Sequence, residues 1–236
     1  RAGRIVLRVA DIAQQTSRDI YFAALGLLVG KIAGAVVPVI TGLPADTNED
    51  ELKALGAAAA SSGAVALFHA VGITPEAPTL DAALQGQAPL KTVDVTLGDL
   101  DEVRQTLNTG REGDELVAVA LGTPHFSLAE FRRLAKILDA YEGAPKSDFY
   151  VNTSRFILWE LGELGLARAF EERGIQIVVD TCTYITPVMR KLSGLVMGNS
   201  GKWASYAPAD IGVTVAYGSM DECVRSAFAG KVRFNG

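Results

Sequence analysis

The fold is decided by residues 116–141, which read LVAVALGTPHFSLAEFRRLAKILDAY. The apolar run over 116–121 is typical of a buried strand, and apolar residues recur at helical spacing from Leu128 to Tyr141. Between them lies a short loop, Gly122 to His125. A strand followed by a loop and a helix indicates one unit of a parallel sheet with helical crossovers.

The same alternation of strand and helix patterns runs through the rest of the chain. Further strand-like runs occur at residues 4–9, 36–40, 64–69, 93–97, 148–151, 175–179, 195–197 and 213–217. Helical patterns separate most of these runs, and the longest covers residues 154–173. We therefore expect an α/β fold of mostly parallel sheets flanked by helices.

The pattern is interrupted by Gly86, Gln87 and Pro89. We place a domain boundary at residues 86–92, with a first α/β domain over 1–90 and a second over 91–236 that carries most of the loops discussed below. The run 4–9 reads as a strand whose beginning is missing. We therefore expect this chain to be part of a longer polypeptide that completes the first domain.

The composition of the 236 residues, 49% hydrophobic and 21% charged, is that of a globular protein. The net charge of -5 leaves no basic excess to neutralise phosphates, so we expect no nucleic-acid partner. The apolar stretch 20–44 contains Lys31, several glycines and Pro38, so we read it as a buried helix and a strand and expect no membrane span. With two cysteines and no signal-like start, we expect the reducing cytoplasm.

Ligands bind outside the carboxyl ends of the strands in open parallel α/β sheets. This rule selects five loops, at residues 68–75, 122–127, 152–155, 180–186 and 198–208. The loop 152–155 places hydroxyls and the Arg155 guanidinium at a helix start, where anions bind, although a simple helix cap with a solvated arginine fits equally well. The loop 198–202, GNSGK, offers backbone amides and Lys202 to an oxyanion, and a plain turn is the alternative.

Cys182 follows the strand-like run 175–179, where a thiolate could bind a metal, although a small core residue is the commoner role. Cys223 lies within a helical pattern and is expected to pack in the core. His69 and His125 each follow a strand-like run, so each is either a ligand or general acid or a structural, hydrogen-bonded histidine. From the residues alone, we expect an α/β protein that binds a small anionic ligand.

At these loops the sequence resembles the aconitase X family, a distant branch of the aconitase superfamily of hydro-lyases. The segments that carry the resemblance are SSGAVALFH (61–69), GITPEA (72–77), GTPHFS (122–127), VNTSR (151–155), VDTC (179–182), GNSGK (198–202) and YAP (206–208). The resemblance implies aconitase-like domains from the carboxyl-terminal part of a catalytic unit. The remainder of that unit and a small swivelling domain or subunit would then be its partners.

The resemblance implies an iron-sulfur dehydratase, a lyase that acts on a small hydroxy acid. The implied reaction is dehydration of cis-3-hydroxy-L-proline to a cyclic imino acid, with mevalonate 5-phosphate or another hydroxy acid as the alternative substrate. By analogy with aconitases, Ser200 is implied as the catalytic base, assisted by Lys202. The implied substrate contacts are Asn152, Ser154, Arg155, Asn199, His69 and His125.

Cys182 is implied as a ligand of the cluster. The sequence departs from the family pattern at Thr123, because the archaeal branch tends to have a cysteine in the corresponding Gly-Cys-Pro-His motif. A threonine cannot supply a soft thiolate. We therefore expect a small cluster, [2Fe-2S], and the hydroxyproline branch. A non-catalytic module that binds a small anion without a cluster remains the alternative from another functional class.

Overall fold

The computed structural model describes residues 1–190 and 193–234 and divides into two compact units, Arg1–Thr106 and Leu107–Gly236. This division differs from the boundary expected at residues 86–92. Strand β4 (Lys91–Val95) pairs in parallel with β1 (Ile5–Val9), so it completes the first sheet, and α4 (Leu97–Leu107) follows it. A break in the local pattern therefore marked a loop within the first unit, because strand pairing is decided by residues far apart in the sequence.

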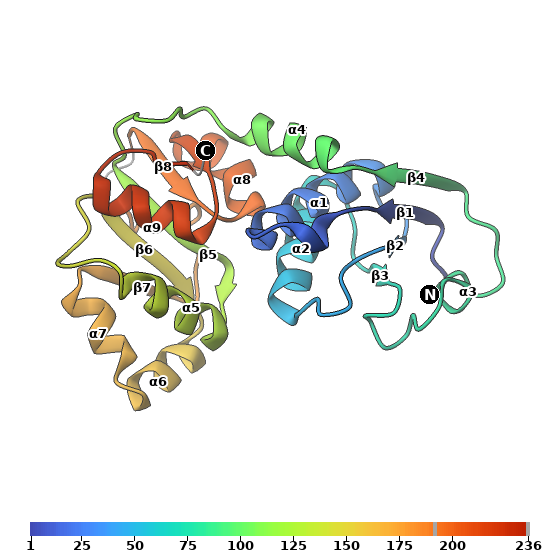
Figure 1. Cartoon of the computed structure of the whole chain (residues 1–236), viewed down its shortest axis with the longest axis horizontal. Coiled ribbons are helices and arrows are strands. Elements are labelled where there is room, and N and C mark those ends of the chain that lie inside the picture. Colours follow the sequence, from blue (N-terminus) through green and yellow to red (C-terminus); the bar gives the residue numbers. More distant parts are fainter. Residues whose placement is uncertain (191–192, 235–236) are drawn as a thin grey trace. The chain divides into compact units, whose positions relative to one another are not determined.

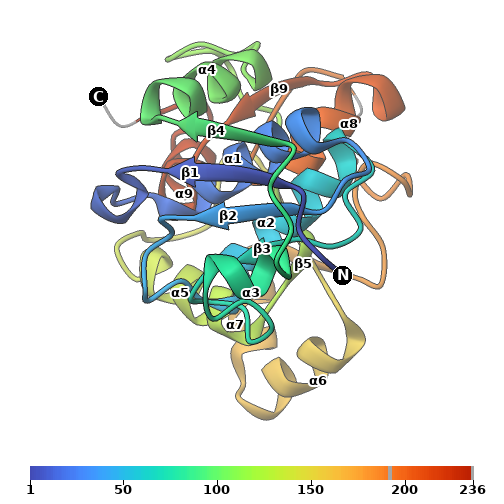
Figure 2. The same ribbon diagram turned by 90° about the vertical axis from the view of Figure 1, so that its right-hand side faces the viewer.

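The first unit contains a four-stranded sheet in the order β3-β2-β1-β4, with β2 at Pro38–Thr41 and β3 at His69–Ala70 (Figure 2). The pairs β1 with β2, β1 with β4 and β2 with β3 are all parallel. Its helical elements are η1 (Ile12–Gln14), α1 (Arg18–Ala33), α2 (Glu49–Ser62) and α3 (Leu80–Leu84). Helix α1 is largely buried and precedes β2, which confirms the expected buried helix and strand in the apolar stretch 20–44.

The second unit contains a five-stranded parallel sheet in the order β7-β6-β5-β8-β9. The strands are β5 (Ala118–Phe126), β6 (Asp148–Thr153), β7 (Ile175–Val179), β8 (Leu195–Gly198) and β9 (Thr214–Tyr217). Its core joins apolar residues of β5, β6 and β8 to residues of the helices, among them Phe131 and Val224, both fully buried. The expected α/β fold with parallel sheets and flanking helices is confirmed.

Helices follow strands β5, β6, β8 and β9 of the second sheet (Figure 1). They are α5 (Leu128–Leu138), α6 (Arg155–Glu163), α7 (Leu166–Glu172), α8 (Gly201–Ile211) and α9 (Met220–Ala229). The sheet order reverses between β5 and β8, and because such crossovers are right-handed, α5 and α8 lie on opposite faces of the sheet. Helix α9 packs beside α5.

Three expected elements differ from the structure. The helix expected over 154–173 is two helices, α6 and α7, separated at Gly165, which takes a left-handed conformation. The strand expected at 64–69 is confined to His69–Ala70. The strand and loop expected at 116–121 and 122–125 form one strand, β5, whose register against β6 shifts between Leu121 and Phe126. This irregular end of β5 shapes the site described below.

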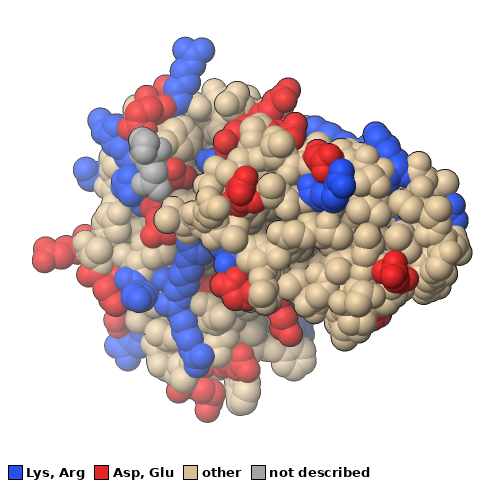
Figure 3. Space-filling model, turned by 45° about the vertical axis from the view of Figure 1, so that its right-hand side comes forward, with Lys and Arg blue, Asp and Glu red and all other residues tan. Residues whose placement is uncertain are grey.

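No helix in the described ranges is long and apolar enough to cross a membrane. On the face of the molecule in Figure 3, Asp and Glu side chains lie among Lys and Arg side chains, with wide uncharged areas between them. This mixture agrees with the modest net charge of -5.

Candidate active site

The carboxyl ends of β5 and β8 lie where the strand order of the second sheet reverses, the position at which open α/β sheets bind ligands. The end of β5 approaches β6 closely at Gly122, which has a φ of 83°. A Cβ atom at this position would overlap the carbonyl oxygen of Asn152 and lie 2.9 Å from its amide nitrogen. A glycine therefore brings the next residue, Thr123, against Asn152.

Thr123 joins three of the loops that the sequence predicts to meet. The Asn152 side-chain amide donates a hydrogen bond to Thr123 Oγ1 over 3.1 Å, and the Ser200 hydroxyl donates to the Thr123 carbonyl oxygen. All three residues are buried. The structure therefore brings together the ends of β5 and β6 and the loop before α8. In this arrangement the Thr123 side chain serves as a hydrogen-bond acceptor.

Asn152 Oδ1 is a buried acceptor without a hydrogen-bond partner among the described residues. The side chain is 0% exposed, so bulk solvent does not supply the missing donor. An unsatisfied buried polar atom costs about 1–3 kcal/mol, and such atoms in folded proteins mark positions where a further partner binds. Asn152 Oδ1 is therefore the atom in this cluster that is best placed to accept a hydrogen bond from a ligand.

Ser200 is the N-cap residue of α8, and its Oγ accepts a hydrogen bond from the backbone N–H of Trp203 over 3.0 Å. The helix begins after β8 with Gly201, and Lys202 follows as its second residue. Asn199 and Lys202 are half-buried, and Lys202 has no ion pair within residues 1–190 and 193–234. The amino end of this 11-residue helix favours negative charge beside the Ser200 hydroxyl.

Cys182 lies in the segment that leaves β7. It is half-buried, and its carbonyl oxygen accepts hydrogen bonds from the backbone N–H groups of Ile185 and Thr186. His125, half-buried at the end of β5, donates from Nε2 to the carbonyl oxygen of Thr181 over 3.3 Å. The structure therefore places His125 beside the Cys182 segment. Cys223, in contrast, is fully buried in the core, as expected.

The two residues after Cys182, Thr183 and Tyr184, contact helix α8. The indole N–H of Trp203 donates to Thr183 Oγ1 over 2.8 Å, and both residues are fully buried. The rings of Tyr184 and Tyr206 stack with centroids 5.5 Å apart. Burial raises the pKa of Tyr184 to about 12, with smaller contributions from Cys182 and Tyr206. Neither contact is predicted by the sequence patterns.

Ser154 and Arg155 have local partners. Ser154 is the N-cap of α6 and accepts from the backbone N–H of Ile157. Arg155 donates to Asp180 through its backbone N–H over 3.1 Å and through Nε over 2.5 Å. The Arg155 backbone N–H, followed by its guanidinium, holds the pKa of Asp180 below its ordinary value. The structure thus shows the helix cap that the sequence analysis gave as one of two alternatives. It pairs Arg155 with Asp180, whereas that alternative expected a solvated arginine.

His69 belongs to the first unit. Its Nε2 donates to the carbonyl oxygen of Arg1 over 2.7 Å, and its Nδ1 lies 3.1 Å from Glu76 Oε1. The side chain is buried, and both ring nitrogens have partners within that unit. These contacts are those of the structural, hydrogen-bonded histidine that the sequence left open as an alternative.

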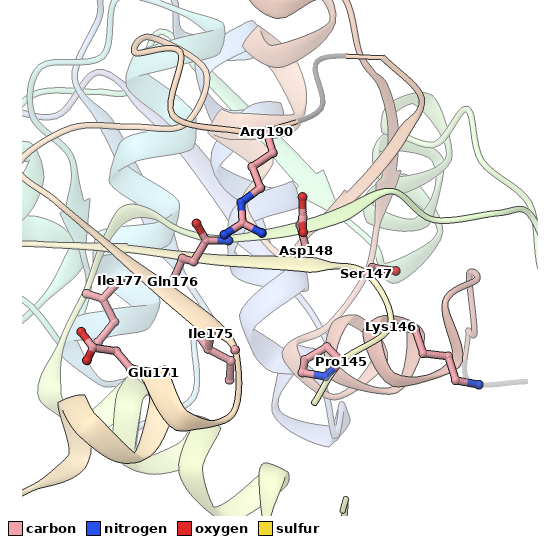
Figure 4. Close-up of a pocket in the computed structure, with 10 residues that line it drawn as sticks. Pro145, Lys146, Ser147, Asp148, Glu171, Ile175, Gln176, Ile177 and Arg190 are labelled. Atoms are coloured by element: carbon pink, nitrogen blue, oxygen red, sulfur yellow. The ribbon is translucent and has the colours of Figure 1, made fainter. Parts of the chain in front are cut away.

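A separate cavity of about 570 Å³ lies at the opposite ends of the strands, where β6 and β7 begin. In Figure 4 the side chain of Arg190 points toward Gln176 and Asp148 from the segment after β7. Because the cavity opens at the amino ends of β6 and β7, it is distinct from the cluster around Thr123 at the carboxyl ends of the strands.

Comparison with known proteins shows the family of the chain. Residues 116–229 match the aconitase X third domain, and residues 3–105 match the aconitase X second domain. The chain belongs to the aconitase X family. Its structure aligns with a crystal structure of Thermococcus kodakaraensis aconitase X in its holo-form with a TM-score of 0.83 and 26% identity, covering 96% of this chain and 55% of that one.

Curated relatives in the family carry two different names. A cis-3-hydroxy-L-proline dehydratase of Hypocrea jecorina is 34% identical, covering 95% of this chain and 37% of that protein, and one of Pseudomonas aeruginosa is 32% identical, covering 98% and 40%. A phosphomevalonate dehydratase large subunit of Methanothermobacter thermautotrophicus is 39% identical, covering 94% of this chain and 53% of that protein. The chain therefore spans only about 37% to 53% of the length of these aconitase X relatives.

The donor groups of the chain do not make up a complete iron-sulfur site, and they offer one thiol outside the core. No group of three or more His, Cys, Asp or Glu side chains arranged to hold a metal occurs within the described residues. Of the two cysteine thiols, that of Cys223 is enclosed in the core and that of Cys182 is half-buried at the carboxyl end of β7. Clusters of this kind are held by several cysteine thiolates. A cluster here would need further ligands from outside this chain.

Proposed function

We propose that this chain is part of a hydro-lyase that dehydrates cis-3-hydroxy-L-proline to a cyclic imino acid. The observation that carries the proposal is the buried cluster of Thr123, Asn152 and Ser200 at the reversal point of the second sheet, with Asn152 Oδ1 lacking a partner among the described residues. The names of the 34% and 32% identical relatives support this substrate.

In this proposal Ser200 Oγ removes the proton α to the substrate carboxylate. The alkoxide that acts as base is stabilised by the Trp203 backbone N–H, at 3.0 Å, and by the amino end of α8. Lys202 and the amides of the Asn199 loop hold the carboxylate, and Asn152 Oδ1 accepts a hydrogen bond from a substrate N–H or O–H group. Loss of the hydroxyl as water then leaves an enamine, which tautomerises to the cyclic imine.

The proposed cofactor of the whole enzyme is a [2Fe-2S] cluster, with Cys182 as the ligand from this chain. Its chemistry when bound is Lewis-acid polarisation of the departing hydroxyl. Ser154, Arg155 and His125 stay predicted substrate contacts. For the first two, substrate binding has to coexist with the helix cap and the Asp180 ion pair that the structure shows. The prediction for His69 is untested, and both of its ring nitrogens already have partners within the first unit, which favours the structural alternative.

Mevalonate 5-phosphate is the second candidate substrate. The observation that favours it is the 39% identity to a protein named phosphomevalonate dehydratase large subunit, which exceeds the identity to the hydroxyproline enzymes. Against it, Thr123 occupies the position at which the archaeal pattern tends to have a cysteine, and its side chain is engaged by Asn152. In both candidate reactions Ser200 removes the proton α to the substrate carboxylate. The same set of variants therefore tests both.

The deciding experiment is turnover of both substrates by the anaerobically purified intact protein and by its Ser200→Ala variant. We expect turnover of cis-3-hydroxy-L-proline and a loss of about 10²- to 10⁴-fold in kcat for the variant, the usual contribution of general base catalysis. Ser219→Ala is the matched control, because Ser219 is the N-cap of α9 and removing its hydroxyl costs a helix cap alone.

Each other outcome contradicts a stated part of the proposal. A near-normal rate in Ser200→Ala would exclude Ser200 as the base. Turnover of mevalonate 5-phosphate alone would replace the substrate. Binding of the substrate carboxylates without turnover of either compound would support the alternative of a small-anion binding module.

A further inference from the structure

Two parts of the proposed site come from strands that are not neighbours. Cys182 follows β7 and Ser200 follows β8, and strands β6 and β5 stand between these two strands in the sheet. The sheet therefore links the Cys182 segment to the start of α8 only indirectly, through β6 and β5. Direct contacts between the two segments would set their separation more closely, as is needed if the thiol and the hydroxyl act on one substrate.

Trp203 makes the first of these contacts, because its backbone and its side chain hydrogen-bond to different segments. Its backbone N–H donates to Ser200 Oγ over 3.0 Å, and its indole N–H donates to Thr183 Oγ1 over 2.8 Å. Trp203 and Thr183 are both 0% exposed. A buried indole N–H requires an acceptor, and the acceptor here is the residue directly after Cys182. One tryptophan thus ties the proposed base to the segment of the proposed ligand.

Tyr206 makes the second contact one turn further along α8. Residues three apart lie on the same side of a helix, so Trp203 and Tyr206 present one surface. Tyr206 stacks on Tyr184 with an interplanar angle of 23°. Two successive residues of the Cys182 segment, Thr183 and Tyr184, therefore contact two residues one turn apart on α8. We call these four residues the clasp.

The turn that carries Thr183 and Tyr184 is held together by its own hydrogen bonds as well. Thr181 and Thr186 hydroxyls lie 2.5 Å apart, and the backbone N–H groups of Ile185 and Thr186 donate to the Cys182 carbonyl oxygen. This closes a tight turn that starts at Cys182. Because the turn is compact and the clasp fixes it to α8, the position of the Cys182 thiol depends on Trp203 and Tyr206.

We propose that Trp203 and Tyr206 are positioning residues that hold the Cys182 thiol in register with Ser200. The inference rests on the proposed function for the roles of Cys182 and Ser200, whereas the mechanical link between the clasp and the thiol stands on the contacts alone. Loosening the clasp should therefore change the exposure of the Cys182 thiol before it changes the stability of the core.

The test is the rate of alkylation of Cys182 by iodoacetamide in the metal-free intact protein at fixed pH, measured by mass spectrometry of the labelled peptide. Trp203→Phe keeps an aromatic ring and removes the N–H donor. We expect the Cys182 rate to rise about tenfold, as loss of one buried hydrogen bond allows. Tyr206→Ala is expected to raise it too, and Tyr206→Phe, which keeps the ring, is expected to leave it unchanged.

The chain offers a matched control for the tryptophan substitution and a second thiol as an internal control for the labelling. Trp159 on α6 is 66% exposed, so Trp159→Phe removes an indole without touching the clasp. Cys223, fully buried, reports on opening of the core within the same sample. An unchanged Cys182 rate in Trp203→Phe and Tyr206→Ala would overturn the proposal. Equal increases at Cys182 and Cys223 would overturn it as well, since they would show that these residues only stabilise the core.

A failure of the proposed function gives a different result. If Ser200→Ala retains turnover, the assignment of Ser200 as the base is wrong. The alkylation rates of the clasp variants still test the positioning role, because they do not depend on turnover. If turnover depends on Ser200 and the Cys182 rates do not respond to the clasp variants, the positioning role is wrong and the proposed function stands.

Discussion

Replacement of Gly122 by alanine tests how closely β5 and β6 have to approach at the site. Gly122 has a φ of 83°, and its added Cβ would overlap the carbonyl oxygen of Asn152 and lie 2.9 Å from the Asn152 amide nitrogen. Both atoms belong to the backbone of a paired strand, so no flexible side chain can move aside. The clash has to be relieved by shifting β5 away from β6 at the point where Thr123 meets Asn152.

The size of the effect has two parts. A side chain in the left-handed region costs about 1–2 kcal/mol. Inserting a methyl group where the surroundings are filled costs roughly a further 1–3 kcal/mol. We therefore expect Gly122→Ala to lower the free energy of unfolding by about 2–5 kcal/mol. Gly113 separates the two parts, because its φ is 89° and nothing lies within 4 Å of its added Cβ. Gly113→Ala should cost only about 1–2 kcal/mol.

Urea unfolding of the intact protein, followed by the fluorescence of the two tryptophans, measures both variants against the wild type. The expected order of stability is wild type, then Gly113→Ala, then Gly122→Ala. Equal losses in the two variants would refute the close-approach argument, because only the conformational part would then be acting. A loss of turnover in Gly122→Ala at unchanged stability would refute the stated origin of its effect.

Substitutions at two further positions test individual side-chain interactions. Thr123→Val removes the oxygen that accepts from the Asn152 amide and should lower the free energy of unfolding by about 1–3 kcal/mol. Thr123→Ser keeps the hydroxyl and should lower it less. Equal losses in the two variants would show that this hydrogen bond does not contribute to stability. The Arg233 guanidinium, with the Phe234 N–H, lowers the pKa of Glu112. The ionised Glu112 carboxylate therefore stabilises the fold above the ordinary carboxyl pKa, and this stabilisation is lost as the pH falls through the lowered pKa of Glu112. Glu112→Gln should therefore lose less stability than the wild type on acidification, an effect that added salt weakens and that identical acid unfolding curves would contradict.

Periodicity and sheet geometry predicted much of the second unit. The pattern over 128–141 predicted α5, and its start is set by the capping box between Ser127 and Glu130. The rule for carboxyl ends selected the loops of Thr123, Asn152 and Ser200, which the structure joins by hydrogen bonds. This succeeded because strand direction follows from crossover helices, and parallel strands place their ends at one edge of the sheet.

Contacts between segments far apart in the sequence could not be predicted in the same way. Thr183 and Trp203 lie in a loop and a helix, and neither a buried threonine nor a tryptophan in a helix indicates which partner it takes. His69 is a second example, because the sequence places it after a strand-like run just as it does His125. Its bonds to Arg1 and Glu76 depend on the fold of the first unit, which local patterns do not specify.

The two cysteines show how position in the fold decides what a thiol can do. Cys223 lies on the buried side of α9, with its Sγ 3.7 Å from the Gly218 carbonyl oxygen, so a metal cannot reach it without opening the core. Cys182 lies at the carboxyl end of the sheet, in a turn fixed to the helix that begins at Ser200. A count of two thiols therefore overstates what this chain can offer a cluster. Since the chain spans 37% to 53% of its relatives, the count also says nothing about the ligands that the rest of such an enzyme contributes.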